Sequence, residues 1–217
     1  MKSITLPLLS CCALFAQTFP LDSLDALKLN KVSAQTTSYI GRAALHVTEP
    51  KEPAAGEDKL VVLTKTQFRD GVIELDLAGK PGAGAAAAAR GFVGIAFRVA
   101  PDLSKFECFY LRPTNGRAED QERRNHSVQY TSFPDYPWQR TRKETPSKYE
   151  TYADLVPGEW TKLRLEVRGL KARLYVNGVQ QPTLIVNDLK LGETSGHIAL
   201  WIGPGTDAYF ANLRVSP

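Results

Sequence analysis

The sequence predicts an all-β domain built from two packed antiparallel sheets. Apolar and polar residues alternate along many short segments, which is typical of strands that bury one face. No segment keeps the 3.6-residue period of a long helix, and turn residues separate about ten candidate strands. A chain of 217 residues is long enough for one such sandwich.

The first 16 residues are typical of a signal peptide. Lys2 precedes the apolar run ITLPLLSCCALFA, which ends at the small residue Ala16. The alternatives are a buried N-terminal strand and lipoprotein processing at Leu9-Ser10-Cys11-Cys12, where neither cysteine follows the usual Gly or Ala. We therefore expect a secreted or periplasmic protein.

We divide the rest of the chain into a lead-in segment, 17–35, and a β domain, 36–217. In the lead-in, the leucines at 21, 24 and 27 could form one or two helical turns, or the segment could enter the first strand.

Charge and composition exclude several classes of function. The chain has 27 Lys+Arg against 23 Asp+Glu, a scattered excess that argues against nucleic-acid binding. No run of 18 apolar residues is present, so we expect no membrane-spanning helix. No phosphate loop or His/Cys motif for a metal appears, and we expect no cofactor and no metal.

Individual strands follow from period-two alternation and from short apolar runs. The alternating segments are 72–77, 160–168 and 171–176, and the last ends at Asn177-Gly178, a pair that tolerates the positive φ of a tight turn. Nearly continuous apolar runs indicate strands covered on both faces, and they lie at 60–63, 92–99, 106–111 and 198–202.

Two segments break this pattern. The low-complexity stretch PGAGAAAAARG at 81–91 is too short to hold a helix alone in water, so we expect a mobile loop that joins two strands. The stretch 112–159 is longer than a hairpin needs and is rich in Arg, Tyr and Pro. Long loops inside compact domains are often functional, and the aromatic content of this one argues against disorder.

Four pieces of the chain together resemble the concanavalin A-like lectin/glucanase superfamily. They are FRDGVIELDLAG (68–79), FECFYLRPTNGR (106–117), PGEWTKLRLEVRGLKARLYVNG (157–178) and GHIALWIGPGTDAYFANLRV (196–215). Their order is similar to that of laminin G-like jelly rolls, and most similar to the bacterial domain named for 3-keto-disaccharide hydrolases. The resemblance covers about 36–215. It implies an all-β, two-sheet antiparallel jelly-roll sandwich whose concave face binds carbohydrate.

The same resemblance leaves the activity open. Glucanases of this fold carry a Glu-x-Asp-x-x-Glu strand, and here Glu74 and Asp76 match the first two acids while Gly79 stands in place of the third. A retaining glycosidase needs two paired carboxyls, so an ordinary polar sheet face is the stronger interpretation of Glu74 and Asp76.

Candidate ligand contacts gather in and after the strand 106–112. Period two places Tyr110 and Arg112 on one face and Glu107 on the other. Arg98 lies in an apolar run, and it could reach solvent at a strand end or line a cleft beside Arg112 to bind sugar hydroxyls or a carboxylate.

The segment 123–130 reads as a strand beside 106–112, with Gln129 as a further contact. His126 could act as a general base, because imidazole titrates near neutral pH; the alternative is a hydrogen-bonded structural histidine. The candidate acids are Glu107, Glu119, Asp120 and Glu150, with no spacing rule that selects among them.

Aromatic rings supply the other half of a sugar site, because pyranose C–H faces pack on them. Trp138 and Tyr136 lie in the long loop and are the candidates for stacking. Trp201 lies in a buried-looking strand, and we expect it in the core.

These observations leave three hypotheses. The first is a secreted carbohydrate-recognising domain that hydrolyses a 3-keto-glycoside, with proton abstraction next to the keto group followed by elimination. The second is a non-catalytic glycan-binding module, which the missing third acid favours. The third is an adhesion module at the cell surface, a role that laminin G-like folds often have.

Overall fold

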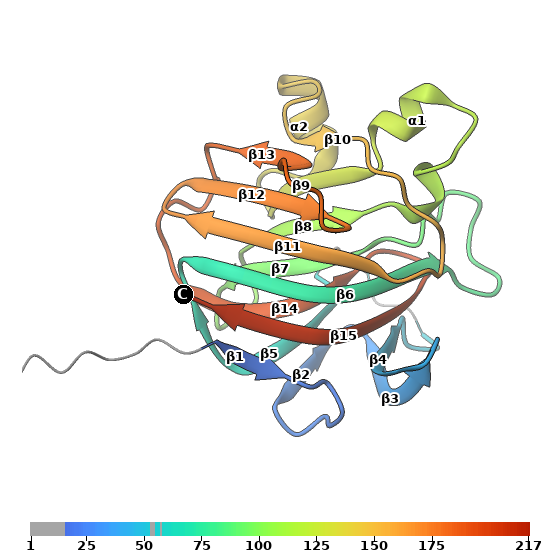
Figure 1. The fold of residues 1–217 in the computed structure, drawn as a ribbon, viewed down its shortest axis with the longest axis vertical. Helices are drawn as coiled ribbons and strands as arrows, with labels where there is room; N and C mark the ends of the chain where they lie inside the picture. Colours follow the sequence, from blue (N-terminus) through green and yellow to red (C-terminus); the bar gives the residue numbers. More distant parts are fainter. Residues whose placement is uncertain (1–15, 53–54, 57) are drawn as a thin grey trace, which may run out of the picture.

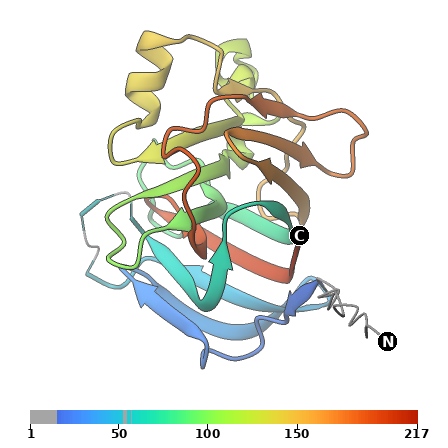
Figure 2. The same cartoon turned by 90° about the vertical axis from the view of Figure 1, so that its left-hand side faces the viewer.

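The computed structural model describes residues 16–52, 55–56 and 58–217. The predicted signal peptide lies outside the described residues except for Ala16. Two antiparallel sheets pack face to face, as predicted (Figure 1). Figures 1 and 2 show two short helices together at one end of the sandwich and the first strands at the other.

One sheet has eight strands. Their order is β13 (Leu184–Val186), β12 (Lys171–Val176), β11 (Thr161–Arg168), β6 (Gly71–Pro81), β15 (Thr206–Ser216), β4 (Arg42–Thr48) and β3 (Ser33–Tyr39), with β1 (Gln17–Phe19) paired to β15. The predicted strands 72–77, 160–168 and 171–176 are β6, β11 and β12, and they are neighbours in this sheet.

The other sheet has seven strands. Their order is β10 (Glu150–Thr151), β9 (Val128–Phe133), β8 (Phe106–Leu111), β7 (Val93–Val99), β14 (Gly196–Ile202), β5 (Leu60–Phe68) and β2 (Leu27–Asn30). All four apolar runs identified in the sequence lie here. The segment 17–35 contributes β1, β2 and the start of β3, so it is part of the sandwich and the strand alternative holds for 27–30.

The main core lies between the sheets and uses the faces that alternation predicted. Ile73, Leu75 and Leu77 of β6 are buried against it, as are the inward residues of β11. A second apolar cluster covers the outer face of the seven-stranded sheet and includes Val62, Ala96, Cys108, Tyr110 and Trp201. This sheet is therefore buried on both faces, which explains its continuous apolar sequences.

The turn after β12 has the expected backbone. Asn177 and Gly178 adopt φ of 55° and 73°, the left-handed conformation that this pair tolerates, and the chain then returns as β13. The 81–91 segment joins β6 to β7 as predicted.

The long segment 112–159 contains the 3-10 turn η1 (Pro113–Asn115) and the helices α1 (Gln121–Asn125) and α2 (Trp138–Glu144). The expectation of a strand over 123–130 is wrong in its first half. Asp120 caps α1 by accepting a hydrogen bond from the backbone N of Arg123 at 3.1 Å, so the chain enters β9 only at Val128. No helix of the described residues has the length and apolar character that crossing a membrane requires.

Candidate functional site

A cleft of about 720 Å³ lies over the outer face of the seven-stranded sheet. Large aromatic residues from four separate parts of the chain line it. They are Phe92, Phe106, Tyr110, Phe133, Trp138 and Trp201. Trp138 is where the sequence placed a stacking residue. Trp201 is buried in an apolar cluster, as expected, but this cluster lies on the outer face of the sheet, so the ring also lines the cleft. Alternation along β14 turns Trp201 outward while Ile202 enters the core.

The floor of the cleft follows from the register of the strands. Gly94 of β7 lies opposite both Trp201 of β14 and Tyr110 of β8. Ala96 lies opposite Ala199 and Cys108 in the same way. Because Gly94 has no side chain, the rings of Tyr110 and Trp201 meet over β7 and form the floor of the cleft.

Two walls rise from this floor. One is formed by the end of β9 and the start of α2, which supply Pro134, Pro137 and Trp138. The other is the alanine-rich loop, which supplies Gly84, Ala85, Ala86, Ala88 and Ala89 and packs on the turn at Gly205. The low-complexity segment therefore presents methyl groups to the cleft.

Arg112 lies behind the aromatic lining and is 5% exposed. Its guanidinium stacks on the rings of Tyr110 and Trp138, at 5.0 and 5.9 Å from their centroids. It donates hydrogen bonds to the Tyr110 hydroxyl at 2.9 Å, Gln129 Oε1 at 3.2 Å and the backbone oxygen of His126 at 2.8 Å. Burial is the main cause that lowers the pKa of Arg112. The predicted contacts Tyr110, Arg112, Gln129 and Trp138 thus meet in one place.

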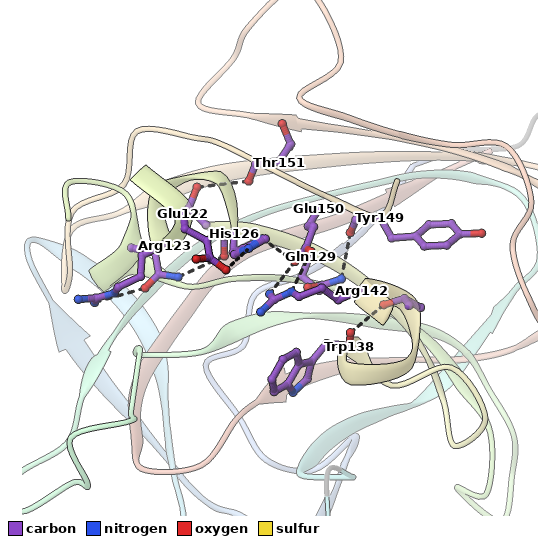
Figure 3. Close-up of polar contacts among 12 residues, drawn as sticks. Glu122, Arg123, His126, Gln129, Trp138, Arg142, Tyr149, Glu150 and Thr151 are labelled. Atoms are coloured by element: carbon purple, nitrogen blue, oxygen red, sulfur yellow. Dashed lines mark hydrogen bonds and ion pairs between the residues drawn. The ribbon is translucent and has the colours of Figure 1, made fainter. Parts of the chain in front are cut away.

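Glu150 lies next to this group, and its side chain is 2% exposed. Arg142 of α2 donates to both carboxylate oxygens, at 2.9 and 2.7 Å, and stacks on Trp138. His126 Nδ1 is 2.9 Å from Glu150 Oε2, close enough for an ion pair when the ring is protonated but not aligned as a hydrogen bond. Figure 3 shows His126 and Arg142 both directed at the Glu150 carboxylate.

The environment of His126 lowers the pKa of its imidazole. Burial is the largest cause and lowers the pKa of the imidazole, the charges of Arg142 and Arg112 lower it further, and Glu150 opposes them. A neutral imidazole can accept a proton, and the adjacent Glu150 carboxylate can stabilise the cation that results.

Glu49 was not found from the sequence. It follows β4 and lines the alanine side of the cleft. Its carboxylate accepts a hydrogen bond from the backbone N of Gly205 at 2.6 Å and lies 3.4 Å from Lys59 Nζ. No local pattern marks this residue, because its partner Gly205 is distant in the chain.

Arg112, Gln129 and His126 do not line the cleft; they lie next to it, where Arg112 contacts Tyr110 and Trp138. The remaining predicted site residues have other places in the fold. Glu107 is 0% exposed and faces the core between the sheets, where it accepts hydrogen bonds from the Tyr130 hydroxyl at 2.6 Å and Leu191 N at 2.8 Å. Burial raises the pKa of its carboxyl. Asp120 caps α1, and Tyr136 packs against the cationic groups of Arg140 and Lys190.

Arg98 differs from both sequence alternatives. Its side chain is 0% exposed and binds the backbone oxygens of Arg69, Gly169 and Gly192, with Asp70 at 3.2 Å. The cause is an irregularity in the pairing of β7 with β14, where Arg98 adopts φ of 52° and departs from the alternation. It therefore joins loops at the end of the sandwich instead of standing beside Arg112.

Glu74 and Asp76 lie on the outer face of the eight-stranded sheet, on the opposite side of the sandwich from the cleft. Asp76 is paired with Arg42 at 2.7 Å and accepts from Asn212 at 2.6 Å. The polar sheet face that we favoured for this strand is what the structure contains.

Solved structures of similar shape support the fold. A carbohydrate-binding module, CBM66, from Bacillus subtilis aligns with a TM-score of 0.55 at 13% identity, over 87% of this chain and 98% of that one. A Bacillus subtilis protein of unknown function with a galectin-like fold gives 0.58 at 14% identity, over 92% and 94%. An apo transglycosylase gives 0.53 at 13% identity, over 93% and 83%. The fold is therefore the predicted jelly-roll sandwich.

Sequence comparison assigns the family. No curated protein matches the chain. The model of the 3-keto-alpha-glucoside-1,2-lyase-like domain matches residues 28–216, which include both sheets from β3 onward and the whole cleft. The match agrees with the family resemblance inferred from the strand motifs. The chain belongs to the family of 3-keto-alpha-glucoside-1,2-lyase-like domains.

Proposed function

We propose that this protein binds a 3-keto-glycoside in the aromatic cleft and cleaves it by elimination across C1 and C2. The observation that carries the proposal is an aromatic cleft in which two of the lining rings, those of Tyr110 and Trp138, also contact the guanidinium of Arg112. Aromatic faces and planar donors are the groups that sugar rings and their hydroxyls require. The family of the chain supports the keto-sugar part of the proposal.

The two ends of the cleft suit the two parts of a glycoside. The sugar ring packs on Tyr110 and Trp138, with its oxygens toward Arg112 and His126. The aglycone extends along the alanine-rich wall, where methyl groups contact apolar surface and offer no side-chain hydrogen bonds. Glu49 lies on that side, and its two carboxylate oxygens are engaged by Gly205 N and Lys59 Nζ.

The chemistry uses the acidity of the proton next to the keto group at C3. His126 removes the proton at C2, the electrons of the C2–H bond form a C1=C2 double bond, and the C1–O bond breaks. The leaving oxygen takes up a proton to give the free alcohol, so the reaction needs no oxidant or reductant. Glu150 is the positioning residue, since its carboxylate lies 2.9 Å from His126 Nδ1.

The experiment is to incubate the protein with 3-keto-trehalose and to follow both glucose release and the ultraviolet absorbance of the conjugated enone. We expect turnover by the native protein, a loss of about 100-fold or more in kcat for His126→Gln, and weaker binding for Trp138→Ala. Trp160→Ala is the matched control, because Trp160 packs on Tyr39 and Arg42 in the other sheet. A His126→Gln variant with native kcat would contradict the assigned base.

The second candidate is a glycan-binding module without activity. Of the described residues that line the cleft, Glu49 alone carries a carboxylate, and both of its oxygens are already engaged by Gly205 N and Lys59. Binding of the keto-sugar that depends on Trp138, with neither glucose nor enone formed, would favour this candidate over the enzyme.

We also propose that the protein is secreted or periplasmic. The support is the sequence of the first 16 residues. N-terminal sequencing of the protein recovered from its native host tests this, with cleavage after Ala16 as the expected result.

A further inference from the structure

Arg90, Arg112 and Arg123 gather around η1, close to where Arg112 stacks on Tyr110 and Trp138. The backbone N of Thr114 donates to the oxygen of Arg90 at 3.3 Å, and Arg123 Nη2 approaches Asn115 Oδ1 at 3.5 Å. Asn115 Nδ2 and Arg112 Nη1 both donate to the backbone oxygen of His126, at 3.3 and 2.8 Å. Arg90, Arg112 and Arg123 therefore surround one short turn.

No carboxylate balances these charges directly. Within the described part of the chain, the ion pairs involve neither Arg90 nor Arg112 nor Arg123, and the hydrogen bonds that Arg90 and Arg112 donate end on neutral oxygens. Burial lowers the pKa of the Arg90 guanidinium, and the positive charges of Arg123 and Arg112 lower it further. Arginines that are partly removed from water normally find an anionic partner.

Two buried donors in the same cluster also lack partners. Among the described residues, Arg123 Nε and Thr114 Oγ1 are buried and make no hydrogen bond. Unsatisfied buried donors cost free energy, so such groups are usually satisfied by something that binds there. Both atoms can donate to an oxyanion.

We propose that the Arg90–Arg112–Arg123 cluster binds an oxyanion on the sugar, so that the ligand is an acidic glycoside. A carboxylate or a sulfate ester provides the planar or clustered oxygens that guanidinium groups bind strongly. Arg112 connects the two parts of the site, since it belongs to the cluster and also stacks on Tyr110 and Trp138 in the cleft. This inference rests on the proposed function for the sugar site and adds the charge of the ligand.

The test compares three ligands that share one aglycone: 4-nitrophenyl β-D-glucoside, the corresponding glucuronide and the glucoside 6-sulfate. Binding is measured by titration calorimetry at low and high salt. We expect at least one acidic ligand to bind about 10-fold more tightly than the glucoside at low salt, with an advantage that shrinks as salt is added. If the glucuronide binds more tightly than the glucoside 6-sulfate, the bound oxyanion is a carboxylate; if the 6-sulfate binds more tightly, it is a sulfate ester.

Variants locate the effect. Arg123→Gln and Arg90→Gln should remove most of the advantage of the acidic ligand and leave glucoside binding unchanged. Arg117→Gln is the matched control, because it removes the same charge from the same segment while its guanidinium is already paired with Asp154 at 2.7 and 2.9 Å.

The outcomes separate this inference from the proposed function. Equal affinity for all three ligands, or an advantage that is insensitive to salt or kept by both cluster variants, overturns the acidic-glycoside inference and leaves the sugar site standing. Binding of none of the three also overturns the acidic-glycoside inference, whereas the proposed function is decided separately by turnover of 3-keto-trehalose. The salt series needs no variant, so the inference remains testable even if a substitution prevents folding.

Discussion

The ring centroids of Trp201 and Tyr110 are 4.7 Å apart, although their strands, β14 and β8, are not neighbours. Strand β7 lies between them and contributes Gly94 at the position opposite both residues. The two rings can lean toward each other because no side chain separates them. The floor of the cleft thus depends on a residue that has no side chain.

Gly94→Ala should destabilise the protein and disturb the cleft. A Cβ at this position would lie 2.6 Å from Tyr110 Cβ, so the ring or the backbone must move, at a cost of about 1–3 kcal/mol. Urea denaturation measures the free energy of unfolding, and titration with a glycoside measures the affinity of the cleft for that ligand. Gly82→Ala is the control, because the added Cβ makes only ordinary contacts from 3.6 Å. Equal stability of the two variants would argue against this account of the floor.

Glu150→Gln should cost far more stability than Glu144→Gln. Glu150 is buried and bound by Arg142, and removing one charge of such a pair costs about 3–5 kcal/mol. Glu144 lies on α2, as Arg142 does, and pairs with Arg140, but both side chains are exposed, and exposed pairs contribute little to stability. Thermal or urea unfolding of the two variants provides the comparison. Similar losses of unfolding free energy in the two variants would contradict a strong interaction between Glu150 and Arg142.

His126 should make the native protein less stable in mild acid. Since the pKa of His126 in the folded chain is below the value of about 6.5 expected in the unfolded chain, the unfolded chain takes up a proton first as the pH falls. The stability that the neutral His126 ring contributes is fully present above a pH of about 6.5. It is lost as the pH falls from that value to the pKa of His126 in the folded protein. The free energy of unfolding of His126→Gln, measured from pH 8 to pH 5, should fall less than that of the native protein. Parallel curves would exclude a depressed pKa.

Glu107 should show the opposite dependence. Burial raises the pKa of its carboxyl above the value in the unfolded chain, so the unfolded chain loses its proton first as the pH rises. The stability present in acid is then lost as the pH passes through the pKa of the folded state. Glu107→Gln should remove this decline, and the difference in unfolding free energy between variant and native protein, followed from pH 4 to pH 8, measures it. A difference that stays constant with pH would contradict the assignment.

Most strands could be predicted because burying one sheet face imposes a visible alternation, as in β6 and β11. The face of a strand covered on both sides could not, because its sequence is apolar throughout; the burial of Trp201 was expected, but its place on the outer face of the sheet was not. Arg98 was missed for a related reason, since one residue of positive φ in β7 redirects its side chain. Helix α1 did carry a local signal, in the N-cap Asp120 followed by helix-forming residues.

The site itself was predicted in part. Tyr110, Arg112, Gln129 and Trp138 could be named because a strand end and an aromatic loop place unusual residues on an otherwise apolar surface. Glu150 and Arg142 could not be paired with His126 from the sequence, because only the return of β10 beside β9 brings these groups together.

Under the proposed function, the alanine-rich wall makes the aglycone side of the cleft replaceable. It contributes to no strand and meets the ligand space through methyl groups, so larger or polar side chains can be introduced there without altering a sheet or the charged end. Related proteins could diverge in the leaving groups they accept by changing this one loop, while the sugar-facing end stays as it is.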